Sequence, residues 1–226
     1  AGLAGDRRAG LRAAAAVMLL VGKLLAAYLI GSISGSLWLG RLRGIDIRQH
    51  GSGNAGGTNA LRTLGIRFAA GVMLIDVSKG ALAAWIGLQG EPDAALALRA
   101  ALGCGFAAVL GHVWPIFHGF RGGKGVATLI GLLLVLWPLL LLPLIAVFAL
   151  VLTTTGYVGL GSILATAAML PSLWLFSTQP PREWIVTAVV FASFVLYTHR
   201  ANVQRLCAGT ENRFEKVRVL ARLFGR

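Results

Sequence analysis

The stretch Gly111-His-Val-Trp-Pro-Ile-Phe-His-Gly-Phe-Arg-Gly-Gly-Lys-Gly-Val-Ala-Thr128 joins two apolar segments through a short loop rich in glycine. Val126 begins a long apolar run, so Gly122, Gly123, Lys124 and Gly125 lie where a helix is expected to start. Free N–H groups and the positive end of the helix dipole favour an anion there, and lysine adds a point charge suited to phosphate. The loop is therefore either a phosphate-binding site or a tight turn whose basic residues mark one side of a membrane.

The composition favours a bilayer as the solvent of most of the chain. Of 226 residues 57% are hydrophobic, and the mean hydropathy is +0.77. The chain has 21 Lys and Arg residues against 8 Asp and Glu residues, a net charge of +13. Most of these basic residues lie between apolar segments and in the tail, which favours contact with anionic lipid headgroups over nucleic acid. The two cysteines, Cys104 and Cys207, indicate neither a disulfide framework nor a metal site.

Apolar segments of about 20 residues predict membrane-spanning helices. We expect an all-α integral membrane protein with about seven such helices, some of them short or half helices. Pro138 divides an apolar run that is too long for one span and short for two, so six or eight elements are the alternatives. We expect one domain over 13–214, a disordered extension over 1–12 and a basic tail over 215–226. The predicted helices are 15–40, 67–89, 95–117, 124–136, 139–155, 157–177 and 183–199.

Seven crossings place the glycine-rich loops on one side of the membrane. That side receives the loops 41–66 and 118–124, the turn 153–161 and the C-terminal tail, with most of the Lys and Arg residues. The positive-inside rule makes this side cytoplasmic. In the second predicted helix Asp76 and Lys79 are one turn apart near the middle of the membrane, so we expect them to pair. His112 is expected to be an interfacial residue beside Trp114.

The loop 41–66 combines four glycines between 51 and 57 with many hydrogen-bond donors. Glycine lets the backbone fold closely around a ligand, and amides, hydroxyls and guanidinium groups suit a polyhydroxylated phosphate. The simpler interpretation is an ordinary loop in which these residues only make turns. The density of donors favours a binding site. Its donors are Arg48, Ser52, Asn54, Thr58, Asn59 and Arg62.

A third polar motif follows the last predicted span. His199, Asn202 and Arg205 recur at three-residue spacing, so they share one face if the helix continues. A lone histidine at the end of a span is usually a capping or snorkelling residue. Three polar groups on one stripe, on the same side as the other two motifs, favour a function.

Together these motifs resemble the PlsY family of bacterial glycerol-3-phosphate acyltransferases, from Gly31 to about Phe214. The resemblance is carried by Gly51-Ser-Gly-Asn-Ala-Gly-Gly-Thr-Asn59, Asp76-Val-Ser-Lys-Gly80, Gly111-His112, Gly122-Gly-Lys-Gly-Val-Ala-Thr128, His199-Arg-Ala-Asn-Val-Gln-Arg205 and Gly209-Thr-Glu211. Three residues depart from the family pattern: Ser34 stands for proline, Gly57 for alanine and Gly159 for serine.

The resemblance implies transfer of a fatty acyl group from acyl phosphate to the 1-hydroxyl of glycerol 3-phosphate, at the cytoplasmic side of the bacterial inner membrane. It implies no cofactor and no metal. Membrane lipids are the expected surroundings. His199 and Asn202 are implied at the reacting hydroxyl, and Ser52, Arg62, Lys124 and Ser162 are assigned to glycerol 3-phosphate. Further substrate-binding candidates are Asn54, Thr58, Asn59, Gly122, Gly123, Gly125 and Arg205.

Two other functions compete with this interpretation. A transporter for small anions predicts polar groups at mid-membrane and repeat symmetry. Only Asp76 and Lys79 lie that deep, and no repeat is visible. A magnesium-dependent phosphoalcohol transferase requires clustered aspartates, which the sequence lacks.

Overall fold

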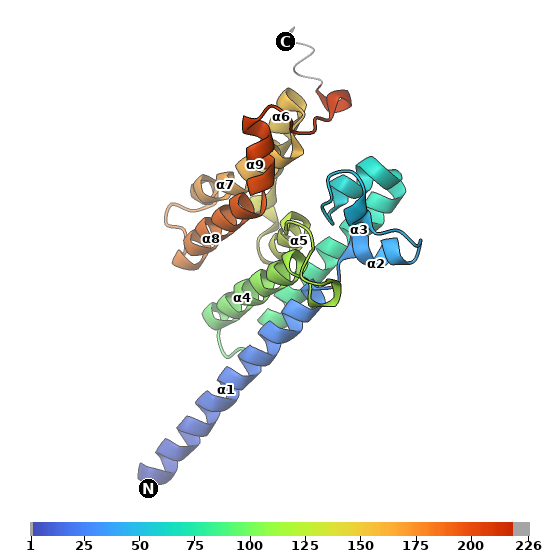
Figure 1. The fold of residues 1–226 in the computed structure, drawn as a ribbon. Helices are drawn as coiled ribbons and strands as arrows, with labels where there is room; N and C mark the ends of the chain where they lie inside the picture. Colours follow the sequence, from blue (N-terminus) through green and yellow to red (C-terminus); the bar gives the residue numbers. More distant parts are fainter. Residues whose placement is uncertain (1, 219–226) are drawn as a thin grey trace.

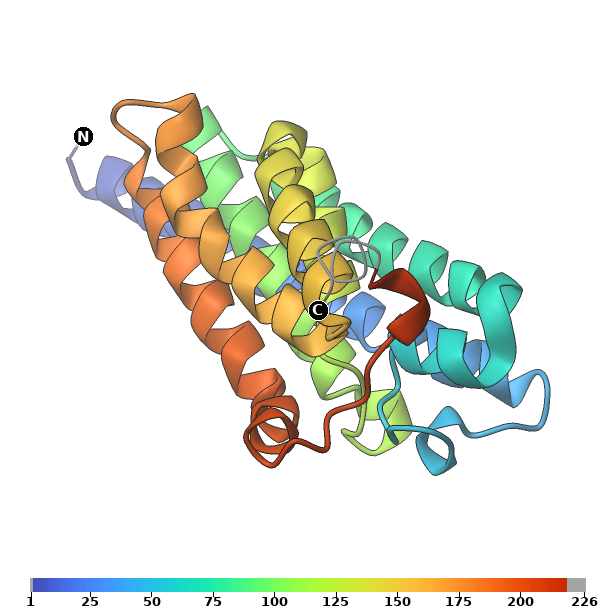
Figure 2. The ribbon, with the colours of Figure 1, turned by 90° about the horizontal axis from the view of Figure 1, so that it is seen from above.

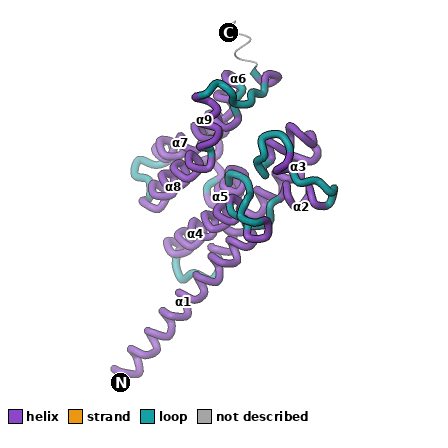
Figure 3. The backbone as a smooth tube through the Cα atoms, viewed as in Figure 1, coloured by secondary structure: helices purple, strands orange, loops and turns teal. Residues whose placement is uncertain are grey.

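The computed structural model describes residues 2–218, and every regular element in this range is a helix (Figures 1 and 3). Short 3-10 turns lie at Ile47–Gln49 (η1), Ile116–His118 (η2), Pro138–Leu140 (η3) and Glu215–Val217 (η4). The α-helices are α1 (Gly2–Gly31), α2 (Gly35–Arg41), α3 (Gly57–Leu88), α4 (Ala94–Val113), α5 (Val126–Leu136), α6 (Leu141–Thr155), α7 (Val158–Phe176), α8 (Arg182–Thr198) and α9 (Arg200–Cys207).

The prediction of a helical membrane bundle is confirmed. By length and composition five stretches of the described chain can cross a membrane, and the pair α8 and α9, bent by 59°, makes a sixth. The remaining apolar helix, α5, has 11 residues and spans only about 16 Å at the usual rise of an α-helix. The prediction that the apolar run breaks near Pro138 is also correct, because α5 ends at Leu136 and η3 begins at Pro138.

Three predicted boundaries differ from the structure. The first helix is not continuous over 15–40, since α1 ends at Gly31 and α2 begins at Gly35. Side chains from α3 replace the hydrogen bonds lost at this break, as described below. Helix α1 already starts at Gly2, within the segment expected to be disordered, and it extends beyond the other helices (Figure 1). Helix α3 starts at Gly57, so the second half of the loop 41–66 is helical up to a kink at Gly65, where φ is 80°.

Glycines bring the helix backbones into close contact. An added Cβ at Gly31 would meet the backbone of Ala108, and one at Gly80 would meet the backbone of Thr128. At Gly131 of α5 it would lie 2.8 Å from the amide nitrogen of Ala81 and closer still to the carbonyl oxygen of Val77. Such contacts between small residues are the usual means by which helices pack in a membrane. They fix α1, α3, α4 and α5 against one another.

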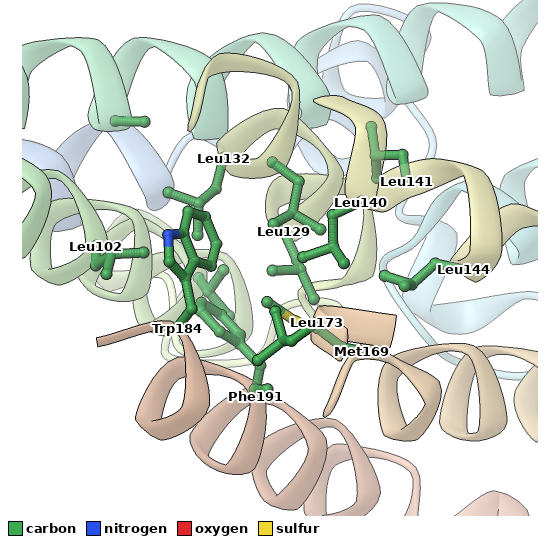
Figure 4. Close-up of a cluster of buried hydrophobic side chains, with 14 residues drawn as sticks. Leu102, Leu129, Leu132, Leu140, Leu141, Leu144, Met169, Leu173, Trp184 and Phe191 are labelled. Carbon is green, nitrogen blue, oxygen red and sulfur yellow. The ribbon is translucent and has the colours of Figure 1, made fainter. Parts of the chain in front are cut away.

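The largest apolar core lies between α4, α5, α6, α7 and α8 (Figure 4). Leu132, Leu140, Met169 and Leu173 are fully buried in it. At one end of this core the ring of Trp137 is 5.9 Å from Phe176 and 5.0 Å from Trp184, centroid to centroid. These contacts bring the end of α5, the end of α7 and the start of α8 to one end of the bundle. The start of α5, the start of α7 and the end of α8 therefore share the other end.

The close contact at Gly131 makes a prediction about stability. The change Gly131→Ala inserts a methyl group against the backbone of α3 and should lower the free energy of unfolding by about 1–3 kcal/mol. Thermal unfolding in detergent can be followed by reaction of the buried Cys104 with a fluorogenic thiol reagent, in a Cys207→Ser background. The matched control is Gly22→Ala in α1, where an added Cβ meets nothing within 4 Å. Equal midpoints for the two variants would contradict this packing.

Candidate active site

A cavity of about 440 Å³ lies at the end of the bundle where the three polar motifs meet. Its apolar wall comes mainly from α3, α5 and α6, with Met73, Leu133 and Leu144 among the lining residues. Eleven of the residues expected to act line it: Ser52, Asn54, Thr58, Asn59, Arg62, Lys124, Gly125, Ser162, His199, Asn202 and Arg205. Gly122 and Gly123 are not among the lining residues.

A hydrogen-bonded chain crosses the polar end of this cavity. Lys124 Nζ donates to Asn202 Oδ1, and Asn202 Nδ2 donates to Glu211 Oε1 at 2.8 Å. The other oxygen of Glu211 accepts from Arg205 Nε at 2.7 Å. Helix α9 continues after the bend at His199, so Asn202 and Arg205 do lie on one face and line the cavity as predicted. This hydrogen-bonded network therefore links the cations Lys124 and Arg205 to the carboxylate of Glu211, the first of them through the amide of Asn202.

His199 lies at the bend between α8 and α9 and is 3% exposed. Its Nδ1 is 2.8 Å from the carbonyl oxygen of Val195. A carbonyl oxygen can only accept a hydrogen bond, so Nδ1 carries the proton. In the neutral ring Nε2 then has a free lone pair. In this tautomer Nε2 can accept a hydrogen bond from a hydroxyl group.

Asn59 lines the cavity, but its side chain holds the loop before α3 in place. Its Nδ2 donates to the carbonyl oxygens of Ile47 at 3.1 Å and His50 at 2.9 Å. Its Oδ1 accepts from the amide of Ser52 at 2.9 Å. Both amide protons are used, so Asn59 supports Ser52 rather than offering donors of its own.

Arg48 and Arg62 have different roles. Arg48 does not line the cavity, since its guanidinium binds Asp46 at 2.7 Å and the carbonyl oxygen of His118 at 2.9 Å. It joins the loop before α3 to the connection after α4. The guanidinium of Arg62 lies over the ring of Phe214, 4.3 Å from its centroid, and donates to Asn212 O at 3.2 Å. The segment after α9 thus passes back across this end of the bundle (Figure 2).

In the glycine loop, residues 119–125, two of the amides that were expected to be free for an anion are hydrogen-bonded within the protein. The amides of Gly122 and Gly123 donate to the carbonyl oxygens of Val113 and His112, each at 3.1 Å. These two amides therefore continue the hydrogen bonding of α4 and are not available to an anion. Gly125, with φ of 89°, precedes the first residue of α5. Lys124, Gly125 and the start of α5 are the parts of this region that face the cavity.

Burial and charge act together on Lys124. Its burial lowers the pKa of the ammonium group to about 8, and the nearby charges of Arg205 and Arg62 act in the same direction while Glu211 opposes them. Three cations, Lys124, Arg62 and Arg205, line the cavity with the carboxylate of Glu211. A phosphate anion would relieve this excess of positive charge.

Two residues of this region, Glu211 and His112, have positions that local sequence patterns do not predict. Glu211 belongs to a motif that carries the family resemblance, and its carboxylate binds both Asn202 and Arg205. The prediction that Asp76 and Lys79 pair is confirmed, with Lys79 Nζ 2.8 Å from Asp76 Oδ1. The interfacial position expected for His112 is wrong: the residue is 3% exposed and its Nδ1 lies 2.8 Å from Lys79 Nζ. Only the packing of α4 on α3 brings these residues together.

Ser162 and Gly159 lie on the same side of the cavity, at the start of α7. Ser162 Oγ donates to the carbonyl oxygen of Val158 at 3.0 Å, which leaves its lone pairs open to a further donor. A Cβ at Gly159 would lie 2.8 Å from Asn202 Nδ2. The glycine at 159 therefore makes room for Asn202.

Comparison with known proteins decides the family. A family model described as glycerol-3-phosphate acyltransferase matches residues 21–209. This chain belongs to the glycerol-3-phosphate acyltransferase family. The family includes a protein of Halalkalibacterium halodurans that is 44% identical over 195 residues, covering 84% of this chain and 93% of that protein. Another member, from Chlorobaculum parvum, is 43% identical over 218 residues, covering 83% and 93%.

Solved structures of this family show the same fold. The crystal structure of PlsY (YgiH), an integral membrane glycerol 3-phosphate acyltransferase, in its glycerol 3-phosphate form aligns with a TM-score of 0.79. It is 35% identical, and the match covers 89% of this chain and 98% of that chain. The lysophosphatidic acid form of the same protein aligns with a TM-score of 0.78. The comparisons thus support an acyltransferase that is an integral membrane protein, not the transporter.

The lowered pKa of Lys124 makes a prediction about anion binding. Lys124 is charged below a pH of about 8, so its attraction for an anion is lost as the pH rises through that value. Sulfate stays a dianion over this range and is the appropriate probe. Between pH 7 and pH 9 its affinity, measured by calorimetry in detergent, should fall by up to about ten-fold. In Lys124→Ala the affinity should be low and nearly independent of pH; a wild-type decline in that variant would contradict the assignment.

Proposed function

We propose that this chain transfers the acyl group of an acyl phosphate to the 1-hydroxyl of glycerol 3-phosphate. The products are lysophosphatidic acid and inorganic phosphate. One observation carries the proposal: a single cavity joins a cationic polar end to an apolar wall. An acyl phosphate has the same two parts, a phosphate group next to a hydrocarbon chain.

The donor is an activated mixed anhydride, so the protein need not supply a nucleophile. The hydroxyl oxygen of glycerol 3-phosphate attacks the acyl carbonyl carbon and forms the new ester bond. The bond from that carbon to the phosphate oxygen then breaks, and phosphate leaves with the electron pair. The hydroxyl proton passes to His199 Nε2 or to a phosphate oxygen. Catalysis then rests on positioning and on stabilising the negative charge of the tetrahedral intermediate.

Most of the predicted residues receive a role in this scheme, whereas Asn59, Gly122 and Gly123 serve to hold the loops in place. Arg62, Lys124, Ser52 and Ser162 hold the phosphate of glycerol 3-phosphate, because they line one polar end. Lys124 with Gly125 and the start of α5 also faces the leaving phosphate. Asn202 orients the Lys124 ammonium, and Glu211 orients Asn202 and Arg205. Asn54 and Thr58 are lining residues that offer further donors to the substrates.

The apolar wall accommodates the acyl chain. Along α5, Val126 and Leu133 both line the cavity. The rise of the helix over this step of seven residues is about 10 Å. On α6, Leu141 and Phe148 line it over the same number of residues. A hydrocarbon chain that leaves the polar end between these two helices enters the apolar interior of the membrane without crossing a polar surface.

We place the polar end of the cavity at the cytoplasmic side of the bacterial inner membrane. Basic residues gather at this end of the described chain, in the loop before α3, the glycine loop and the region after α8. The positive-inside rule assigns such an end to the cytoplasm. The soluble substrate glycerol 3-phosphate is then bound from the side on which phosphorylated metabolites are made.

A donor test examines the proposal directly. Purified protein in detergent should release phosphate from palmitoyl phosphate only when glycerol 3-phosphate is present, with formation of lysophosphatidic acid in equal amount. Palmitoyl coenzyme A and palmitoyl acyl carrier protein should give no product. Because hydrogen bonds to charged groups contribute about 1.5–3 kcal/mol, Arg62→Ala and Lys124→Ala should each lower kcat/KM by about ten-fold or more.

The matched control for Arg62→Ala is Arg67→Ala, an exposed arginine of the same helix that does not line the cavity. It should keep wild-type kinetics. Wild-type kinetics in both Arg62→Ala and Lys124→Ala would contradict the assignment of these two residues to the substrate phosphate. Product formation from palmitoyl coenzyme A at a comparable rate would remove acyl phosphate as the specific donor.

A further inference from the structure

A buried charged cluster lies directly behind the glycine loop and has no part in the reaction scheme above. It consists of Asp76, Lys79 and His112, which are 1%, 4% and 3% exposed. Asp76 and His112 both line the cavity. Charged groups within a membrane segment are costly and are usually tied to function.

The three protons of the Lys79 ammonium match three acceptors. Nζ lies 2.8 Å from Asp76 Oδ1, 2.8 Å from His112 Nδ1 and 2.9 Å from the carbonyl oxygen of Ile33. An ammonium group has donors only, so His112 Nδ1 is the acceptor in this contact. The neutral imidazole therefore carries its proton on Nε2. Lys79 thus fixes both the orientation and the tautomer of His112.

The cluster also closes the break between α1 and α2. Asp76 Oδ1 accepts from the amide of Gly35 at 3.1 Å, and Lys79 satisfies the carbonyl of Ile33. Both backbone groups lost their helical partners at the break, and unsatisfied groups at this depth are expensive. Hydrogen bonds to the break between α1 and α2 therefore hold the Asp76 and Lys79 side chains of α3 in place, and Lys79 in turn contacts His112 of α4.

The opposite edge of the His112 ring contacts the glycine loop. A Cβ at Gly123 would meet His112 Nε2 and would lie 2.9 Å from its Cε1. The backbone of the same two residues is joined by the hydrogen bond from the Gly123 amide to the His112 carbonyl at 3.1 Å. The next residue is Lys124, whose carbonyl oxygen accepts from Thr198 Oγ1 at 3.2 Å. The loop is thus held between His112 on one side and α8 on the other.

We infer that Asp76, Lys79 and His112 form a positioning unit that holds the glycine loop, so that the Lys124 ammonium meets Asn202 and the bound phosphate. His112 is the residue of the unit that touches the loop, and it acts through Lys124. This inference rests on the proposed function for its kinetic consequences. The same geometry predicts an effect on anion binding that needs no reaction.

A double-mutant cycle tests whether His112 acts through Lys124. The four proteins are wild type, His112→Leu, Lys124→Ala and the double variant, each assayed for kcat and for KM of glycerol 3-phosphate. His112→Leu should lower kcat/KM about ten-fold when Lys124 is present and less than two-fold when it is replaced by alanine. Equal fold losses in the two backgrounds, or no loss in the single variant, would overturn the inference. A residue that only stabilises the fold gives equal losses.

Two further variants keep the test decisive if His112→Leu does not fold. Gly123→Ala keeps all three side chains of the cluster but places a methyl group against the His112 ring and displaces the loop. The loss of kcat/KM that it causes should therefore also be smaller in the Lys124→Ala background. His112→Gln retains one acceptor and one donor group, so it should recover much of the activity that His112→Leu loses. The control is His118→Gln, in the connection between α4 and the glycine loop. His118 does not line the cavity, so this variant should behave as wild type. Additive losses for Gly123→Ala would overturn the inference.

Sulfate affinity measured in the same proteins separates this inference from the proposed function. If wild type releases no phosphate from palmitoyl phosphate, the proposed function fails, and the cycle is then read from sulfate binding. His112→Leu should weaken sulfate several-fold in the presence of Lys124 and hardly at all in Lys124→Ala. Unchanged sulfate affinity in His112→Leu and Gly123→Ala would overturn the positioning role.

Discussion

Three cationic side chains share the polar end of the cavity with the carboxylate of Glu211. Their like charges repel one another, Glu211 offsets part of this repulsion, and bound anions would relieve more of it. The contacts of Lys124 with Asn202 and of Arg205 with Glu211 keep these cations in place before any ligand arrives. Under the proposed function this arrangement is preorganised for the phosphate groups of the substrates, because cations from separate parts of the chain are already held at one end of the bundle.

The membrane imposes the second constraint on the architecture. Each backbone group freed by a helix break must find a new partner inside the protein. At the break between α1 and α2 the side chains of Asp76 and Lys79 supply these partners, and at the end of α4 the amides of Gly122 and Gly123 do so. The irregular backbone around the cavity is thus stabilised by hydrogen bonds within the protein, and of the residues that supply them Lys79, Gly122 and Gly123 do not line the cavity. We expect such residues to matter to the site as much as those that line it.

Much of the fold and of the site followed from local patterns in the sequence. Apolar length predicted the spans, Pro138 marked the break after α5, and the spacing of Asn202 and Arg205 predicted their common face. The contacts that local patterns do not predict join residues far apart in the chain. The break near Ser34 depends on Asp76, some forty residues away, and the buried position of His112 depends on how α4 packs on α3. The role of Glu211 depends on the turn after α9, which brings its carboxylate back to Asn202.

The shared pocket can be examined most directly by the accessibility of single cysteines in membrane vesicles of known orientation. Cys207 is exposed and is replaced by serine, while Cys104 is buried. Single substitutions Ser52→Cys, Lys124→Cys and Asn202→Cys are then treated with a membrane-impermeant thiol reagent from either side. All three should react from the cytoplasmic side only, and glycerol 3-phosphate should slow the reaction at position 52. Reaction of any one of them only from the opposite side would contradict a common phosphate-binding pocket.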